Sequence, residues 1–191
     1  MADPTAFPPR LSPFSALFAV AESDPDPAVM LTARTLDQVQ IDCDPKLAGT
    51  IALPLPPAGR AVSIDDMRLL SMAPGRWIAV STDTPPLIDR LQATCGPNGA
   101  VLVEQGHGRA ALRISGPRSR DLLAKGTGLD LHPRAFAENS VASTALFHVA
   151  VTIDRRRGSG TFDVHMPRGY AHSLAERLIA AGRQFGVGIT A

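Results

Sequence analysis

Cysteines, aromatic residues and long apolar runs are scarce in this sequence of 191 residues, and each shortage excludes a class of protein. Cys43 and Cys95 are the only cysteines, and neither has a second cysteine or a histidine at the spacing of a zinc site. Because they also make no disulfide framework, we expect a reducing, cytoplasmic setting. No apolar run approaches the roughly 18 residues of a membrane helix. We therefore expect no membrane partner, and interpret residues 1–30 as an N-terminal arm and linker.

An excess of charge of one sign is also missing. The chain carries 19 Lys and Arg against 18 Asp and Glu, so its net charge of +1 gives no electrostatic case for nucleic acid. The charge is uneven along the chain, however, at −5 over residues 1–104, +5 over 105–160 and +1 over the remainder. A basic segment against an acidic half indicates either a docking surface for a protein partner or two solvated faces of one domain.

Motifs that carry catalysis or hold metals are likewise absent from the sequence. There is no G-x-S-x-G nucleophile turn and no phosphate-binding P-loop. No metal site is predicted, because no two histidines stand four residues apart on a predicted helix among His107, His132, His148, His165 and His172. We expect His148 and His165 on exposed sheet faces, and residues 155–160, RRRGSG, as a solvated hairpin turn.

One short motif has the spelling of a dinucleotide-binding turn. Residues 106–111, GHGRAA, follow an apolar run and match G-x-G-x-x-A. Such a turn must lead into a helix, whose N-terminus receives the pyrophosphate. Here Ala110, Leu112 and Ile114 alternate with a second set that contains Arg113, which is the period of a strand. The sequence therefore predicts a strand-turn-strand connection with Arg113 outside, and no bound nucleotide.

The order of predicted elements indicates an α+β fold. Apolar periodicity predicts one domain over residues 31–191, with possible halves at about 31–105 and 106–191. Strands are expected at residues 34–41, 50–56, 76–81, 100–105, 109–115, 143–155, 161–167 and 187–190, and helices at 84–95, 117–126 and 169–186. Helices placed between strands in this order are typical of ferredoxin-like split β-α-β repeats.

One loop combines rigid and polar residues in a way that predicts a functional surface. A helix closed by Gly126 leads into a glycine-rich stretch that places polar side chains on alternate positions before Phe136. Polar groups held by a rigid loop form a candidate site. We take the candidate partner interface to be Lys125, Asp130, His132, Arg134 and Phe136.

Residues 114–136, ISGPRSRDLLAKGTGLDLHPRAF, resemble the gamma subunit of heterotetrameric sarcosine oxidases. The resemblance runs from about residue 31 to the end and includes GRWIAVS at 75–81 and TFDVHMPRGYAHSLAERL at 161–178. That family is in turn similar to the folate-binding domain of the glycine-cleavage aminomethyltransferase, or T-protein. Laying the T-protein pattern on this chain puts Asp130 at the catalytic aspartate. Thr144 and Phe147 stand where T-proteins have a tyrosine-containing segment, so the resemblance implies a structural role for Asp130.

The resemblance implies a non-catalytic assembly subunit. In such a complex the alpha, beta and delta subunits are the partners, and they hold FAD, FMN, NAD and tetrahydrofolate while sarcosine is oxidised to glycine with transfer of the one-carbon unit. We expect no cofactor on this chain, and we expect docking through the basic middle segment and the N-terminal arm, with Trp77 and Phe136 as core or interface anchors. Two alternatives stay open: a stand-alone folate-binding protein that uses Asp130, and the equivalent subunit of another N-methyl amino acid dehydrogenase.

Overall fold

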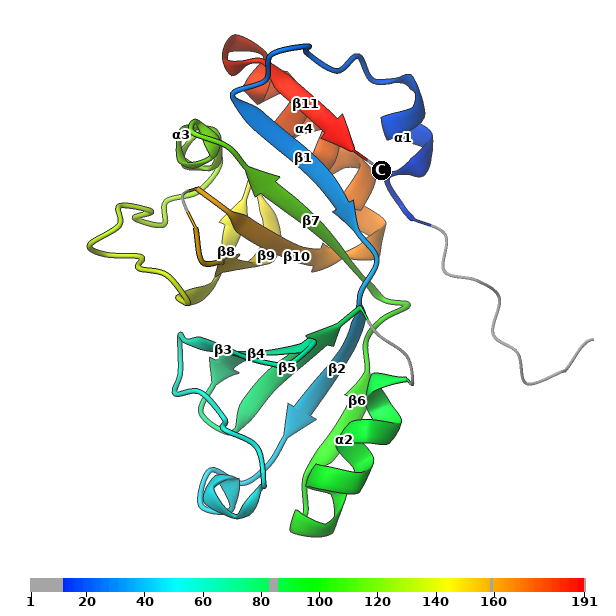
Figure 1. Ribbon diagram of the computed structural model, residues 1–191, viewed down its shortest axis with the longest axis vertical. Helices are drawn as coiled ribbons and strands as arrows, with labels where there is room; N and C mark the ends of the chain where they lie inside the picture. Colours follow the sequence, from blue (N-terminus) through cyan, green and yellow to red (C-terminus); the bar gives the residue numbers. More distant parts are fainter. Residues whose placement is uncertain (1–11, 83–85, 159, 191) are drawn as a thin grey trace, which may run out of the picture.

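The computed structural model describes residues 12–82, 86–158 and 160–190, which form two β-sheets stacked as two lobes along the long axis (Figure 1). Sheet A has six strands in the order β11-β1-β7-β10-β9-β8. Their bounds are β1 (Val29–Arg34), β7 (Arg109–Ser115), β8 (Val141–Leu146), β9 (Val149–Arg155), β10 (Phe162–Pro167) and β11 (Val187–Thr190). Sheet B has five strands in the order β3-β4-β5-β2-β6. Their bounds are β2 (Asp37–Asp42), β3 (Ala61–Ile64), β4 (Met67–Ala73), β5 (Arg76–Ser81) and β6 (Val101–Glu104).

Helices are few and short in the described part of the chain. The α-helices are α1 (Ser15–Val20), α2 (Leu87–Cys95), α3 (Ser119–Ala124) and α4 (Ala171–Gly182). Single 3-10 turns occur at η1 (Ala48–Thr50), η2 (Gly96–Asn98), η3 (Arg168–Tyr170) and η4 (Arg183–Phe185). Among the residues that the structure describes, no helix has the length and apolar character needed to cross a membrane.

Strand direction follows from split β-α-β connections. In sheet A, the chain passes from β7 through α3 and β8 to β9, and β10 lies between β7 and β9. It then passes from β10 through α4 to β11, and β7 and β1 lie between those two strands. In sheet B, β2 lies between β5 and β6, which α2 connects. The predicted α+β class is therefore confirmed. Sheet B contains one such unit and a β3-β4 hairpin, whereas sheet A contains two units with β1 inserted.

The apolar core is divided by the sheets. The largest cluster lies on the helical side of sheet A, where Leu112, Val164 and Leu174 are buried together with Phe14 and Phe18 from the N-terminal arm. A second cluster lies on the helical side of sheet B. Only a small cluster of apolar side chains lies between the sheets, and polar side chains fill much of the remaining layer.

Two predicted strands are wrong, and three strands of the structure were not predicted. Residues 50–56 form no strand but a bent segment, which Trp77 holds against sheet B through a 2.9 Å hydrogen bond from Nε1 to the Pro56 carbonyl. The predicted strand 143–155 is two strands, because Phe147 and His148 both have positive φ and turn the chain. Strands β1, β3 and β4 were not predicted. β4 is buried on both faces, so its sequence MRLLSMA lacks the alternation of a half-buried strand.

Candidate functional site

The loop 125–136 projects from sheet A between α3 and β8 (Figure 1). Two of its apolar side chains, Leu131 and Phe136, are each 5% exposed and belong to the sheet A core. The backbone amides of Ala135 and Phe136 both donate to the His132 carbonyl, at 2.9 and 2.8 Å. The loop therefore presents its polar residues from a backbone tied to the core.

Three of the five predicted interface residues form one exposed turn. Oδ1 of Asp130 accepts a 2.8 Å hydrogen bond from the backbone amide of His132, and Nδ1 of His132 accepts a 3.3 Å bond from the amide of Arg134. All three side chains are exposed. The other two lie elsewhere: Lys125 donates from Nζ to the Ala181 carbonyl at 2.6 Å, and Phe136 is in the core.

The Asp130 carboxylate shapes a turn in the way that aspartates commonly do. General acid or base catalysis needs a carboxylate that faces its substrate in a pocket with a matched pKa. Asp130 is instead exposed and caps its own loop.

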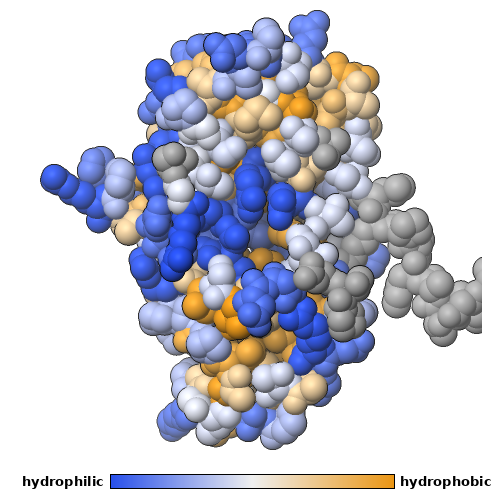
Figure 2. Space-filling view, in the orientation of Figure 1, coloured by the Kyte–Doolittle hydropathy of each residue, from blue (hydrophilic) through white to orange (hydrophobic). Residues whose placement is uncertain are grey.

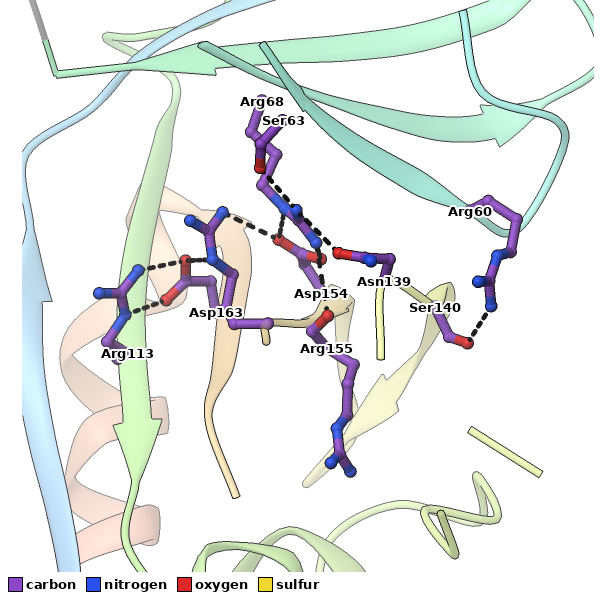
Figure 3. A network of polar contacts seen from close by, with 10 residues as sticks. Arg60, Ser63, Arg68, Arg113, Asn139, Ser140, Asp154, Arg155 and Asp163 are labelled. Carbon is purple, nitrogen blue, oxygen red and sulfur yellow. Dashed lines mark hydrogen bonds and ion pairs between the residues drawn. The ribbon is translucent and has the colours of Figure 1, made fainter. Parts of the chain in front are cut away.

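A buried ion pair joins the two sheets (Figure 3). Arg68 of β4 donates from Nε and Nη2 to the two carboxylate oxygens of Asp154 on β9, each at 2.7 Å. The Arg68 guanidinium also reaches Ser63 and Asn139, at 2.9 and 3.2 Å. The side chains of the pair are 5% and 1% exposed. Two parallel charge-assisted hydrogen bonds give this contact a defined direction as well as strength.

The network continues within sheet A. Arg113 and Asp163 face each other in register on β7 and β10 and form a bidentate pair at 2.7 and 2.8 Å. Burial opposes ionisation of Asp163, but the hydrogen bonds and charge of Arg113, together with the charges of neighbouring groups such as Arg156, outweigh it, so the pKa of Asp163 is lowered. Arg156 lies 3.6 Å from Asp154 and 3.7 Å from Asp163, and burial lowers its pKa. The sequence pattern predicted Arg113 on an outer face, and this prediction is wrong: the side chain is turned toward sheet B.

His165 is the clearest error of the sequence analysis. It was predicted on an exposed sheet face, but it is 1% exposed, and neither ring nitrogen has a hydrogen-bond partner in the described structure. Burial lowers its pKa, more than the charges of Asp163 and Asp154 raise it. The alternation along β10 correctly placed His165 on the face opposite the apolar side chains. Sheet B covers that face, so His165 is buried. His148 is exposed as expected, although it lies in the β8-β9 turn.

The prediction that residues 155–160 form a solvated hairpin turn is correct only in part. β9 and β10 do form a hairpin, with Arg155 opposite Phe162. The arginines are not all solvated, because Arg155 is buried, Arg156 is half-buried and Arg157 is exposed. Residue 159 lies outside the described residues.

Hydrophilic residues gather across the waist between the lobes (Figure 2). A cleft of about 200 Å³ opens between the sheets there. Its charged lining residues are Arg34, Asp65, Asp66, Arg68, Arg113, Arg156 and Asp163. Charges of both signs share these walls, so the cleft has no strong preference for a ligand of either sign.

The glycine turn at 106–108 joins β6 of sheet B to β7 of sheet A, which confirms the predicted strand-turn-strand connection. The amides of Gly108 and Arg109 both donate to the Gln105 carbonyl at 3.0 Å. No helix begins there, so the turn lacks the helix N-terminus that a pyrophosphate requires.

The N-terminal arm packs against its own chain. Phe14 and Phe18 stack at 5.5 Å and are buried in the sheet A core. Leu17 and Val20 line a groove of about 790 Å³ beside α4 and β11. Val20 is 78% exposed. Residues 1–11 lie outside the described residues, so their part in docking stays a prediction.

Sequence reasoning missed the residues that join the sheets. Arg68 lies in a strand that was not recognised, whereas Asp154 and Asp163 lie in segments that were predicted as strands, opposite the apolar set. No local signal marked these residues as buried, because charged side chains on the strand face opposite the apolar set are usually exposed to solvent.

Comparisons with known proteins agree with this architecture. The family described as the GCVT N-terminal domain matches residues 35–190. The sarcosine oxidase subunit gamma of Corynebacterium sp. (strain U-96) is 28% identical over 111 residues, which is 57% of this chain and 54% of that protein. The corresponding subunit of Arthrobacter sp. is 30% identical over 46% of this chain and 43% of its own length. The chain thus spans about half the length of the curated relatives it matches.

Two solved structures extend the likeness over most of the chain. One chain of the heterotetrameric sarcosine oxidase from Corynebacterium sp. U-96, in complex with pyrrole 2-carboxylate, has a TM-score of 0.80 at 25% identity, covering 92% of this chain and 96% of that one. The glycine cleavage system aminomethyltransferase T from Bartonella henselae has a TM-score of 0.66 at 18% identity, covering 86% of this chain and 48% of that one. The second similarity concerns the fold alone.

Proposed function

Because the chain belongs to the GCVT N-terminal domain family, we propose that it is the gamma subunit of a heterotetrameric, flavin-dependent sarcosine oxidase and contributes assembly rather than catalysis. The observation that carries this proposal is the similarity to one chain of such an oxidase over 92% of this chain and 96% of that one. A fold by itself implies no function, because chemistry resides in particular sites. The exposed, turn-capping position of Asp130 supports a role without catalysis.

In this proposal the alpha, beta and delta subunits hold the FAD, FMN, NAD and tetrahydrofolate that the reaction uses. The chain's own residues support that division. The G-x-G-x-x-A turn at 106–111 leads into β7 and lacks a pyrophosphate-binding helix N-terminus, and the Asp130 carboxylate is occupied in its own loop. The cytoplasmic setting belongs to the same proposal.

The contact with the partners is proposed at the loop 125–136. Asp130, His132 and Arg134 are exposed there on a backbone fixed by Leu131 and Phe136, so little conformational entropy is lost on docking. The wider basic segment contributes less than its net charge indicates, because Arg113, Arg118 and Arg156 pair with aspartates of this chain. Phe136 serves as the core support of this surface.

Co-expression with the flavin-carrying subunits tests the proposal. The chain should co-elute with them in size-exclusion chromatography at fixed stoichiometry and carry their visible flavin absorbance into the same peak. A chain that remains a stable monomer in the presence of those subunits would contradict it. Exchanging sarcosine for other N-methyl amino acids as substrates of the assembled enzyme separates the oxidase from another N-methyl amino acid dehydrogenase built in the same way.

A stand-alone folate-binding protein is the second candidate, because Asp130 stands at the position that the T-protein pattern gives to its aspartate. Ligand binding to the folded state raises the unfolding temperature. We expect tetrahydrofolate in excess to leave the unfolding temperature of the isolated chain unchanged. Stabilisation that Asp130→Asn abolishes would favour the folate-binding candidate instead.

A further inference from the structure

Two arginines on the helical side of sheet A have buried guanidinium nitrogens without a hydrogen-bond partner among the residues that the structure describes. Arg155 ends β9, and its guanidinium points away from the network between the sheets, which its backbone carbonyl joins (Figure 3). Arg120 comes from α3. Both approach the same aromatic ring: the guanidinium carbons lie 5.2 Å (Arg155) and 6.0 Å (Arg120) from the centre of the Phe162 ring.

Arg155 is buried and Arg120 is half-buried, and each has guanidinium nitrogens that are buried and incompletely hydrogen-bonded. Arg155 is 5% exposed, and its Nε and Nη1 are buried with no hydrogen-bond partner in the described structure. The Nε of Arg120 is in the same state. Cation-π contact with Phe162 stabilises the two guanidinium groups, but it leaves these N–H donors unpaired. Buried donors that lack a protein acceptor are rare in folded proteins, and water, an ion or a ligand commonly supplies the missing acceptor.

The charge balance around the pair is positive. Burial lowers the pKa of Arg155, and the neighbouring charge of Arg120 lowers it further. The acidic group whose field opposes this is Glu138, whose Oε1 accepts a 3.0 Å hydrogen bond from the amide of Gly158. Two guanidiniums facing one already engaged carboxylate leave net positive charge beside the end of the loop 125–136.

We propose that Arg120 and Arg155 form a binding site for an anionic oxygen group, a carboxylate or a phosphate. A planar guanidinium presents parallel N–H donors that match such groups in a bidentate way, and a bound anion would also screen the repulsion between the two arginines. The group comes either from a free small anion or from an acidic side chain of a protein partner. The second source rests on the proposed assembly function.

Thermal unfolding of the isolated full chain tests the first source. Sodium sulfate and sodium acetate are compared with sodium chloride at equal ionic strength, because sulfate also stabilises proteins without binding a site. We expect sulfate to raise the unfolding temperature by a few degrees more in the wild type than in Arg155→Met or Arg120→Met. Arg177→Met on the exposed face of α4 is the matched control and should keep the wild-type gain.

The stability of the variants gives a second readout. Arg155→Met removes a buried charge that lacks partners, so in chloride this variant should unfold at a temperature equal to or above that of the wild type. If Arg155→Met fails to fold, Arg155→Lys keeps the charge but loses the paired donors, and should lose most of the sulfate gain.

Assembly with the flavin-carrying subunits tests the second source. Arg155→Met and Arg120→Met should bind them about tenfold more weakly than the wild type, as expected for the loss of charge-assisted hydrogen bonds, while Arg177→Met binds normally. The proposal is overturned if both variants match the wild type in sulfate gain and in assembly. Failure of the wild type itself to assemble contradicts the proposed function instead, and leaves the sulfate comparison decisive for the site.

Discussion

Arg68 on sheet B and Asp154 on sheet A hold each other through two 2.7 Å hydrogen bonds in a setting that excludes water almost completely. Each residue belongs to a different lobe, and they are 86 positions apart in sequence. The pair therefore fixes how the two sheets meet. Burying two charges costs desolvation energy, so replacing both members by apolar side chains can leave stability unchanged, whereas removing one leaves an uncompensated buried charge.

Breaking this pair should destabilise the fold far more than breaking an exposed one. Asp154→Asn leaves the Arg68 charge buried, and we expect a loss of about 3 kcal/mol or more in the free energy of unfolding by urea titration. The double variant Arg68→Met, Asp154→Leu should recover most of that loss. Asp42→Asn, which breaks the exposed pair with Arg76, is the control and should cost less than about 1 kcal/mol. Equal losses at the two sites would contradict this account.

The buried His165 should make stability depend on pH. Its pKa is lowered from 6.5 by burial, so below about pH 6.5 the unfolded chain binds a proton that the folded chain does not. Stability should then fall as pH falls from 6.5, approaching 1.4 kcal/mol per pH unit for this one group. Urea titrations of the wild type and His165→Met between pH 7.5 and about pH 5 measure the difference in slope.

His172→Gln supplies the control for that experiment, because His172 is exposed on α4. Its slope should stay close to that of the wild type. If His165→Met shows the same pH dependence as the wild type, His165 is not the group responsible.

Gly116, between β7 and α3, should tolerate no side chain. Its φ is +110°, and a Cβ there would lie 2.5 Å from the carbonyl oxygen of Ala28. We expect Gly116→Ala to cost about 2 kcal/mol or more, because both the backbone conformation and the contact are unfavourable. Gly128→Ala is the matched change, since a Cβ there meets nothing within 4 Å. It should change the midpoint of thermal unfolding little.

Within the loop 125–136, we expect one substitution to affect mainly the stability of the fold and another to affect mainly the contact with partner subunits. Phe136→Ala removes a buried ring and should lower the free energy of unfolding by about 3 to 5 kcal/mol. Arg134→Glu alters an exposed side chain and should leave stability within about 0.5 kcal/mol of the wild type, while weakening co-elution with the flavin-carrying subunits. A stable Arg134→Glu variant that assembles as well as the wild type would remove Arg134 from the proposed interface.

Local pattern was sufficient where a segment has one apolar face and clear end signals. The strand at 76–81 and the helices near 87–95, 119–124 and 171–182 were placed from such patterns. β4 was not predicted because both of its faces are covered, which removes the alternation of apolar and polar residues. Residues 50–56 were wrongly predicted as a strand, because the hydrogen bond from Trp77 to Pro56 holds that segment against sheet B without strand pairing. Within the candidate site, the loop was recognised from its glycine and polar spacing, and three of its five residues do form one exposed turn.

The sequence by itself determined the α+β class, the strand-turn-strand character of residues 106–108 and the resemblance to the sarcosine oxidase gamma subunit, because each depends on local periodicity or on a contiguous motif. Only the tertiary structure decided which polar strand faces are buried. The positions of Arg113, His165 and Arg68 relative to solvent depend on whether a second sheet covers them. Alternation along a strand separates its two faces but carries no information about what packs on each.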